Sequence, residues 1–302
     1  MSGRAHDREY FYKYASAETA MRIIAARSFR WSAPTNFNDP FDHQVGFFLD
    51  LDDHEFARHL TTSIERIVFT DAPVGTGASL EFTHLLLQLR AIRDRLRRAD
   101  VLAELHASSL ATAANLRSGI DNFNATIQSH LLHSRVFCVA ERPDNIVMWS
   151  HYADEHRGVV FHLACSDALD NRLLAARRVT YADSFIAFPN AEEYAMHLTG
   201  ERPLDFVALS WNMALTKHLD WSYEREWRVH IPLLQAPGGS GYSTYEEPAE
   251  VFASIYLGCR MASAQVEAIL SAANQHLPHT KVYRAVRSTK SFSLVIELVY
   301  ET

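Results

Sequence analysis

Hydrophobic and polar positions follow first a strand period and then a helix period near the start of the chain. Residues 10–14 (YFYKY) are aromatic-rich and predict a strand, whereas residues 17–27 place apolar side chains at helical spacing. Ser16 precedes this helix and is the expected N-cap. Residues 29–33 (FRWSA) predict a short strand that runs into Pro34. The pattern therefore predicts a compact strand, helix, strand unit.

The middle of the chain changes to a helical pattern. From Asp52 to His133 the apolar positions recur with the helical period, and residues 72–79 (APVGTGAS) have the composition of a loop between two helical stretches. We therefore predict a helical insertion over about 52–133. Residues 190–218 are also expected to be mainly helical.

Strand patterns dominate the rest of the chain. Helices are expected at 144–156, ended by Gly158, near 167–176 and at 263–275. Strands are predicted at 135–141, 158–164, 177–183, 222–233, 252–258, 281–287 and 291–300. Because these strands outnumber regular βαβ alternations, we predict an α+β fold with a mixed or antiparallel sheet, forming a single domain over 1–302.

Composition and charge narrow the class of protein. Of the 302 residues, 48% are hydrophobic, which is enough to fill a sizeable core. The net charge of −7 argues against nonspecific binding to duplex DNA, which relies on a basic surface. A basic run remains at 90–98 (RAIRDRLRR), and this is where we expect a nucleic-acid acceptor to bind.

Cysteine usage and apolar run length indicate the compartment. Cys138, Cys165 and Cys259 lie far apart inside apolar runs, so we expect buried free thiols in a reducing environment. The start, MSGRAHDREY, has no apolar core of an export signal, and no stretch of 18 consecutive apolar residues occurs. We therefore predict a cytoplasmic protein that does not enter a membrane.

Three motifs carry a resemblance to a known family. They are NDPF at 38–41, MWSHYADEHRG at 148–158 and W-x-x-E-x-E-W-R at 221–228. Together with their flanking segments they resemble a bacterial family described as a domain of unknown function. The resemblance covers nearly the whole chain outside the helical insertion, and it implies roles in phage defence or as a toxin.

The first strand, helix, strand unit is also similar to the opening of the ADP-ribosyltransferases, especially those that modify nucleic acids. In that family a basic or histidine side chain on the first strand contacts NAD, a hydroxyl follows on the second, and a glutamate comes from a late strand. The resemblance implies an ADP-ribosyltransferase-like sheet with NAD as co-substrate and Lys13, Ser32 and Glu226 in these places. Lys13 departs from the usual histidine or arginine. Its neighbour Tyr14 is also counted among the residues expected to contact NAD.

Side chains of a strand alternate between its two faces, so the predicted strand 222–233 has its ionic side chains on one face. Cleavage of the glycosidic bond of NAD builds positive charge on the ribose, which a carboxylate stabilises, so Glu226 is a catalytic candidate. Arg228 is expected to contact the cofactor and to keep one glutamate ionised, while Glu224 is a second catalytic candidate near the nucleophile. The alternative is a solvated face with a surface ion pair. The residues on this face are Ser222, Glu224, Glu226, Arg228 and His230.

The NDPF turn has two interpretations. In the functional one, Asn38 and Asp39 point into a cleft and contact the ligand, held there by Phe37 and Phe41 packed on the core. In the structural one, Asn38 or Asp39 caps local backbone and Pro40 fixes the turn.

Met148, Trp149, Tyr152 and Ala153 share one face of the predicted helix 144–156. The functional interpretation uses Trp149 or Tyr152 as a stacking wall for nicotinamide or a base, with His151 as a third catalytic candidate that binds substrate. The alternative is that the rings only fill the core. The chain has 16 histidines, but HExxH and paired CxxC spacings are absent, so no metal ligand is predicted.

Functions from three classes fit these residues. We favour an NAD-dependent ADP-ribosyltransferase-like enzyme, acting as a toxin or phage-defence effector on a nucleic-acid or protein acceptor. The alternatives are a nuclease that uses His151, Asp39 and Glu226, and a noncatalytic protein that senses a ligand. We predict that the segments 12–14, 37–42, 148–152 and 222–228 line one cleft.

Overall fold

The computed structural model describes residues 4–43, 51–70, 72–185, 189–233 and 241–300. Contacts within the chain divide it into two compact units. Unit 1 comprises Met1–Gln44, His130–Asp183 and Leu215–Thr302, and unit 2 comprises Val45–Ser129 and Ser184–Ala214.

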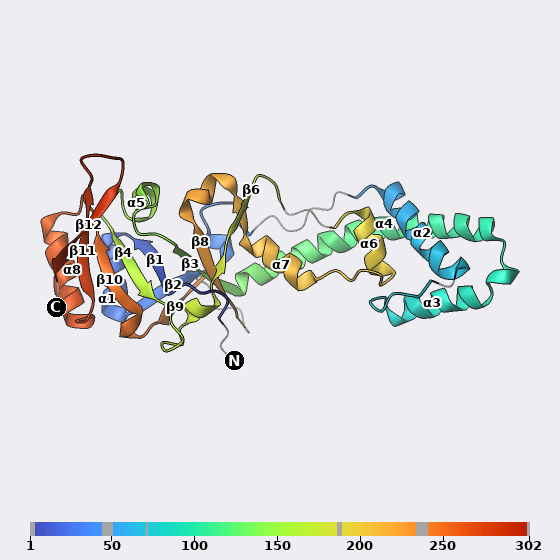
Figure 1. Ribbon diagram of the computed structural model, residues 1–302, viewed down its shortest axis with the longest axis horizontal. Helices are drawn as coiled ribbons and strands as arrows, with labels where there is room; N and C mark the ends of the chain where they lie inside the picture. Colours follow the sequence, from blue (N-terminus) through green and yellow to red (C-terminus); the bar gives the residue numbers. More distant parts are fainter. Residues whose placement is uncertain (1–3, 44–50, 71, 186–188, 234–240, 301–302) are drawn as a thin grey trace. The chain divides into compact units, whose positions relative to one another are not determined.

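Unit 1 is built on an open β-sheet (Figure 1). Among the described strands the pairs of this sheet are antiparallel except β10 with β11, so the predicted α+β class with a mixed sheet is confirmed. The strands follow one another in space as β12 (Leu294–Tyr300), β11 (Lys281–Arg287), β10 (Phe252–Leu257), β4 (Val159–Ala164), β1 (Tyr10–Ala15), β3 (Ser134–Ala140), β2 (Ser28–Ser32) and β9 (Tyr242–Glu246). β8 (Glu226–Pro232) pairs with β3 and with β5 (Arg177–Arg178), while β6 (Thr180–Ala182) and β7 (Thr216–His218) form a separate parallel pair.

Two helices, α1 (Ala17–Ala26) and α8 (Ser263–His276), cover one face of this sheet (Figure 1). The predicted N-cap is confirmed, because Ser16 Oγ accepts a hydrogen bond of 3.2 Å from the Thr19 N–H. Beneath the helices the ring of Phe29 lies 5.3 Å from that of Phe252 and 5.9 Å from that of Phe161. This aromatic core holds β1, β2, β4 and β10 in place.

The opposite face carries α5 (Ile146–Tyr152), which is shorter than predicted. The expected helix 144–156 ends at Tyr152, and Asp154 to His156 adopt positive φ between 48° and 68°. The chain turns here because Gly158 must come close to β1, where a Cβ atom would lie 2.2 Å from the Ala15 carbonyl oxygen. Only glycine allows this approach, so the helix cannot continue to the end of the motif.

The predicted strand 222–233 is wrong in its first part. Residues Leu219–Glu224 form the 3₁₀-helix η4, Arg225 takes a left-handed conformation with φ of 45°, and β8 begins only at Glu226. The alternating pattern of SYEREW did not mark a strand, because Glu224 is fixed by partners from α5 and β7. The interpretation as a solvated face is also wrong, since Glu224, Glu226 and Arg228 are buried.

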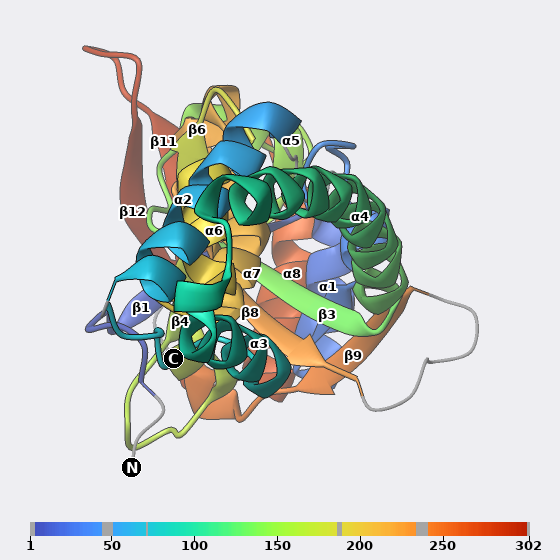
Figure 2. The same cartoon turned by 90° about the vertical axis from the view of Figure 1, so that its right-hand side faces the viewer.

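Unit 2 is helical, and the predicted helical segment of about 52–133 lies largely within it, together with 184–214. Its helices are α2 (Asp53–Phe69), α3 (Leu80–Ala91), α6 (Ala191–Leu198) and most of α4 (Arg98–Leu132) and α7 (Phe206–Leu215). The apolar face of α2 packs against α3 and α6 (Figure 2). Within the described part of the chain, no helix combines the length and hydrophobicity needed to cross a membrane.

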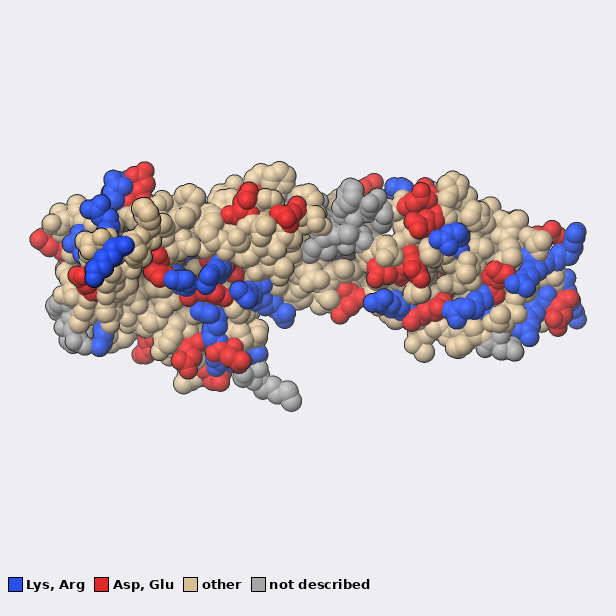
Figure 3. Space-filling model, turned by 45° about the horizontal axis from the view of Figure 1, so that its top comes forward, with Lys and Arg blue, Asp and Glu red and all other residues tan. Residues whose placement is uncertain are grey.

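The basic run 90–98 lies between the end of α3 and the start of α4. Lys and Arg gather at the right-hand end of Figure 3, and Asp and Glu lie among them. Arg98 Nε donates a hydrogen bond of 2.9 Å to Glu65, and Arg97 Nε lies 3.5 Å from an Asp100 carboxylate oxygen. Part of the positive charge of the run is therefore balanced locally.

Candidate functional site

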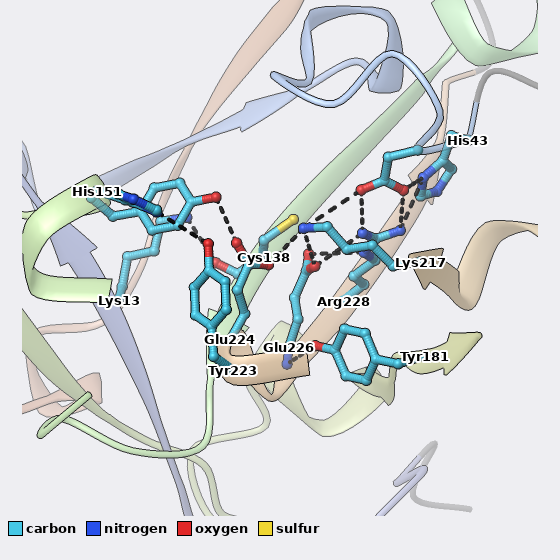
Figure 4. A network of polar contacts seen from close by, with 12 residues as sticks. Lys13, His43, Cys138, His151, Tyr181, Lys217, Tyr223, Glu224, Glu226 and Arg228 are labelled. Atoms are coloured by element: carbon cyan, nitrogen blue, oxygen red, sulfur yellow. Dashed lines mark hydrogen bonds and ion pairs between the residues drawn. The ribbon is translucent and has the colours of Figure 1, made fainter. Parts of the chain in front are cut away.

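A pocket of about 460 Å³ lies in unit 1, within the size range of small-molecule sites. Its lining side chains come from β1, β2, β3, the NDPF turn, α5, β7, η4 and β8. Figure 4 shows the network of polar contacts at this pocket. The four segments that were expected to line one cleft all contribute to it. The predicted site residues that line the pocket are Lys13, Tyr14, Ser32, Asn38, His151, Tyr152, Glu224 and Glu226.

Glu226 is the first residue of β8, and its buried carboxylate is held by two cations. Arg228 donates two hydrogen bonds to it, from Nε to Oε1 at 2.8 Å and from Nη2 to Oε2 at 2.9 Å. Lys217 Nζ adds a contact of 3.1 Å to Oε2. Burial would raise the pKa of Glu226, but the charges of Arg228 and Lys217 lower it below the usual range. The carboxylate is therefore ionised at neutral pH.

Arg228 joins the NDPF turn to the W-x-x-E-x-E-W-R motif, which lies far from it in the sequence. Besides Glu226, its guanidinium binds Asp42 of the NDPF turn, from Nη1 to Oδ1 at 2.8 Å and from Nη2 to Oδ2 at 2.6 Å. Arg228 is completely buried and does not line the pocket, so the expected contact with the cofactor is wrong. Its place in the site is to hold two carboxylates in position.

Lys217, on β7, is a central residue of the site that was missed in the sequence. Its Nζ lies 2.5 Å from Glu224, 3.1 Å from Glu226 and 3.8 Å from Asp42. Burial would lower the pKa of Lys217, but Glu226 and Glu224 raise it, so the amine is charged. The sequence TKH around it has no motif, and only the W-x-x-E-x-E-W-R carboxylates nearby hinted at a buried cation.

Glu224 and Tyr152 form a second polar pair at the pocket. Tyr152 Oη donates a hydrogen bond of 2.6 Å to Glu224 Oε1. Burial and the charge of Glu226 raise the pKa of Glu224, and burial and the charge of Glu224 raise the pKa of the Tyr152 phenol. Tyr152 is therefore neutral and acts as a donor. His151, the third catalytic candidate, is exposed and its Nδ1 lies 3.1 Å from Tyr223 Oη.

The residues expected to contact NAD from the first strand face the same pocket. Lys13 Nζ donates a hydrogen bond of 2.7 Å to the Cys138 carbonyl oxygen. Tyr14 Oη donates one of 2.8 Å to the Arg142 carbonyl oxygen. Ser32 lies at the end of β2 and lines the pocket with both.

Besides Arg228, two more predicted site residues do not reach the pocket, Trp149 and Asp39. Trp149 is completely buried and its Nε1 donates a hydrogen bond of 2.6 Å to the Pro143 carbonyl oxygen, so the stacking wall assigned to it is wrong. Asp39 is also buried, and its Oδ1 accepts a hydrogen bond of 2.9 Å from the Phe41 N–H. The carboxylate of Asp39 stabilises the turn, as in the structural interpretation, and Asp42 is the residue of this turn that reaches the site.

The expected packing of Phe41 on the core is wrong, and the described contacts of Phe37 are with polar residues of the site. Phe41 is 63% exposed and does not pack on the core. Phe37 packs edge-on to His43 at 5.4 Å and lies 5.6 Å from the Arg228 guanidinium. The turn is therefore held mainly by the ion pair of Asp42 with Arg228, because one of its two phenylalanines points to solvent.

The three cysteines are free thiols, as expected, but only Cys165 is fully buried. Cys138 lines the pocket, and burial together with the charge of Glu226 raises the pKa of its thiol. Among the described residues no group of three His, Cys, Asp or Glu side chains is arranged to hold a metal ion. Lys217 and Arg228 occupy the space between the site carboxylates.

The fold and the site define an α+β protein with a small-molecule pocket above a buried cluster of carboxylates and cations. Residues 148–229 match the model of a family described as protein of unknown function (DUF2971), which confirms the expected relation to a domain of unknown function. The matched segment contains most of α5, all of β7 and η4 and the first half of β8, so it supplies Tyr152, Lys217, Glu224 and Glu226. No curated protein and no solved structure matches the chain.

Acid is expected to destabilise unit 1 through two stacked histidines, the buried His43 and the partly buried His230. The rings of His43 and His230 stack at 5.2 Å, and burial, His43 and Arg228 lower the pKa of His230 to about 3. The unfolded imidazole titrates near about 6.5, so the unfolded chain binds protons that the folded ring does not. The stability contributed by neutral His230 is therefore present above about pH 6.5 and is lost as the pH falls toward 3.

Thermal unfolding measured between neutral pH and about pH 5 tests this expectation. His230→Phe keeps an aromatic ring and should flatten the fall of the melting temperature in this window. His54→Phe, on the exposed side of α2, is the matched control and should leave the slope unchanged. A His230→Phe slope equal to that of the wild type would contradict the expectation.

Proposed function

We propose that this protein is an NAD-dependent ADP-ribosyltransferase-like enzyme that acts on a nucleic-acid or protein acceptor. The observation that carries the proposal is the meeting of Lys13, Ser32 and Glu226 in one pocket, from β1, β2 and β8. These are the three positions that the resemblance assigned to NAD contact. Tyr12, Tyr14 and Tyr152 add aromatic surface suited to a nicotinamide or adenine ring. Roles in phage defence or as a toxin belong to the same proposal through the family resemblance.

The two glutamates have different capacities in this reaction. The oxygens of Glu226 already accept hydrogen bonds from Arg228, Lys217 and the Cys138 thiol. Glu226 therefore acts as a fixed negative charge facing the ribose, where oxocarbenium character develops. The described hydrogen bonds to Glu224 come from Tyr152 and Lys217. Its carboxylate therefore retains lone pairs that can accept a hydrogen bond from a ribose hydroxyl or from the attacking group.

The proposed step breaks the glycosidic bond between ribose C1′ and the nicotinamide nitrogen. Both electrons of that bond leave with nicotinamide, and an acceptor oxygen or nitrogen forms the new bond to C1′. The acceptor proton passes to Glu224, whose pKa is raised above its usual value by burial and by Glu226. The nuclease alternative loses support, because Asp39 is buried in its turn and does not meet His151 and Glu226 in the pocket.

NAD binding tests the proposal directly. NAD in large excess should raise the melting temperature of the full chain, since a ligand at about 100 times its Kd stabilises by roughly 2.7 kcal/mol. Lys13→Met should weaken binding about tenfold by removing a charge from the pocket, as measured by calorimetry. Lys290→Met, on the exposed β11–β12 connection, is the control and should bind normally.

The outcome also separates the classes of function. Stabilisation by NAD together with its consumption in the presence of an acceptor supports the enzyme. Stabilisation without consumption for any acceptor indicates a ligand-sensing protein instead. Wild-type protein that neither binds nor consumes NAD would overturn the proposal.

A further inference from the structure

A row of aromatic side chains crosses the sheet of unit 1 on the face opposite α1 and α8. We call it the aromatic face and define it by Tyr10, Tyr12, His162, Tyr256 and Tyr283. The register of the sheet places Tyr12 opposite His162 and Tyr256 opposite Tyr283. The ring of His162 stacks on that of Tyr12 at 4.9 Å and 14°, and the rings of Tyr256 and Tyr283 lie 5.4 Å apart.

The aromatic face is only partly covered. Tyr256, in the middle of the row, is buried in the hydrophobic cluster around α5, and Tyr12 and Tyr283 pack against that cluster. Tyr10, which shares β1 with Tyr12, is 42% exposed, and Tyr12, His162 and Tyr283 are half-buried. The larger core cluster of unit 1 lies on the other face with Phe29 and its neighbours, whereas the rings of Tyr10, Tyr12, His162 and Tyr283 keep part of their surface open to solvent.

Two exposed cations lie on this face. Period two along β11 puts Lys281 and Arg287 on the same face as Tyr283, and both side chains are exposed. Among the described residues, no aspartate or glutamate lies on this face of β1, β4, β10, β11 or β12. Asp144 lies near Tyr12 but forms an ion pair of 2.6 Å with Arg142. This contrasts with the net charge of −7 for the whole chain.

We propose that the aromatic face binds single-stranded nucleic acid. Unpaired bases would stack on Tyr10, Tyr12 and Tyr283, and the phosphates would lie along Lys281 and Arg287. A duplex does not fit this chemistry, because its bases are already stacked on one another. Tyr12 also lines the pocket, so a strand bound here leads directly to it. The idea that the bound nucleic acid is the acceptor of ADP-ribose rests on the proposed function. The binding of single strands to the aromatic face does not depend on it.

Fluorescence anisotropy with labelled single strands of about 12 nucleotides tests the proposal, with DNA and RNA in separate arms. The full chain without NAD is used throughout. Tyr10→Ala and Tyr283→Ala should each weaken binding about tenfold, whereas Tyr283→Phe keeps the ring and should bind normally. Tyr242→Ala is the matched control, since Tyr242 is similarly exposed but lies on β9.

Salt dependence tests the phosphate contacts. Lys281→Ala and Arg287→Ala should each reduce the slope of log affinity against log salt by about 0.7. Equal binding of single strands and duplexes, or unchanged binding by both tyrosine variants, would overturn the proposal. Loss of binding only on charge reversal of Arg95, Arg97 and Arg98 would also overturn it and place the site on the basic run of unit 2.

The Glu226→Gln variant tests single-strand binding separately from the proposed NAD-dependent activity. It should bind single strands as the wild type does, because Glu226 is buried in the pocket. If single strands bind but NAD is never consumed, the aromatic face is a nucleic-acid site and only the idea that the bound strand is an acceptor is wrong. If NAD is consumed but single strands do not bind, the aromatic face falls and the acceptor is of another class.

Discussion

Replacement of Arg228 by methionine is expected to lower the free energy of unfolding by about 3 to 5 kcal/mol. Arg228 is completely buried and donates two hydrogen bonds to each of Asp42 and Glu226. Methionine fills much of the volume but leaves both carboxylates in the interior, with Lys217 as their remaining cation. Urea unfolding followed by the fluorescence of the five tryptophans measures the loss.

A surface arginine provides the control for this prediction. The Arg97 side chain is 87% exposed and its ion pair with Asp100 spans 3.5 Å, so Arg97→Met should change stability by less than about 0.5 kcal/mol. The double variant Asp42→Asn with Arg228→Met should lose less than the sum of the single variants, since the two side chains share one interaction. Additive losses would show that Asp42 and Arg228 are not coupled.

The second large effect is expected on NAD chemistry. Glu226→Gln keeps the shape of the side chain but removes the negative charge that we propose faces the ribose, so the rate of NAD cleavage should fall about 10²–10³-fold. Lys217 and Arg228 retain Glu224 and Asp42 as partners, so the variant should fold with reduced stability. Single-turnover cleavage, measured below its melting temperature and at saturating NAD, separates the chemical step from binding.

Glu224→Gln is the matched comparison, because Glu224 belongs to the same cluster and also lines the pocket. It should impair transfer to the acceptor more than cleavage of NAD, since Glu224 is proposed to take the acceptor proton. A Glu226→Gln enzyme with full activity would remove the carboxylate from the proposed mechanism.

Local patterns predicted the parts of the fold that depend on neighbours in the sequence. The strand, helix, strand opening and the cap at Ser16 follow from periodicity and one hydroxyl, and both are present. β9 (Tyr242–Glu246) was missed, because YSTYE alternates without an aliphatic residue. It is stabilised by pairing along the whole of β2, which no local pattern contains.

In the candidate site too, local motifs predicted some residues, whereas the residues that depend on long-range contacts were missed. Motifs directed attention to Asn38, Tyr152, Glu224 and Glu226, all of which line the pocket. They did not distinguish Asp42 from Asp39, which lie three positions apart in one turn, because the choice depends on the position of Arg228. Lys217 lies outside every motif, and its importance follows only from the three carboxylates that surround its amine.

The pairing of Asp42 with Arg228 has a consequence for synthesis, since 186 residues separate the two side chains along the chain. On the ribosome, the NDPF turn is complete long before β7, η4 and β8 have been made. Contacts of such long range form late, after the intervening chain is available to close the loop. A nascent chain therefore carries no assembled pocket, and whatever the pocket binds meets a complete site only after β8 has been made.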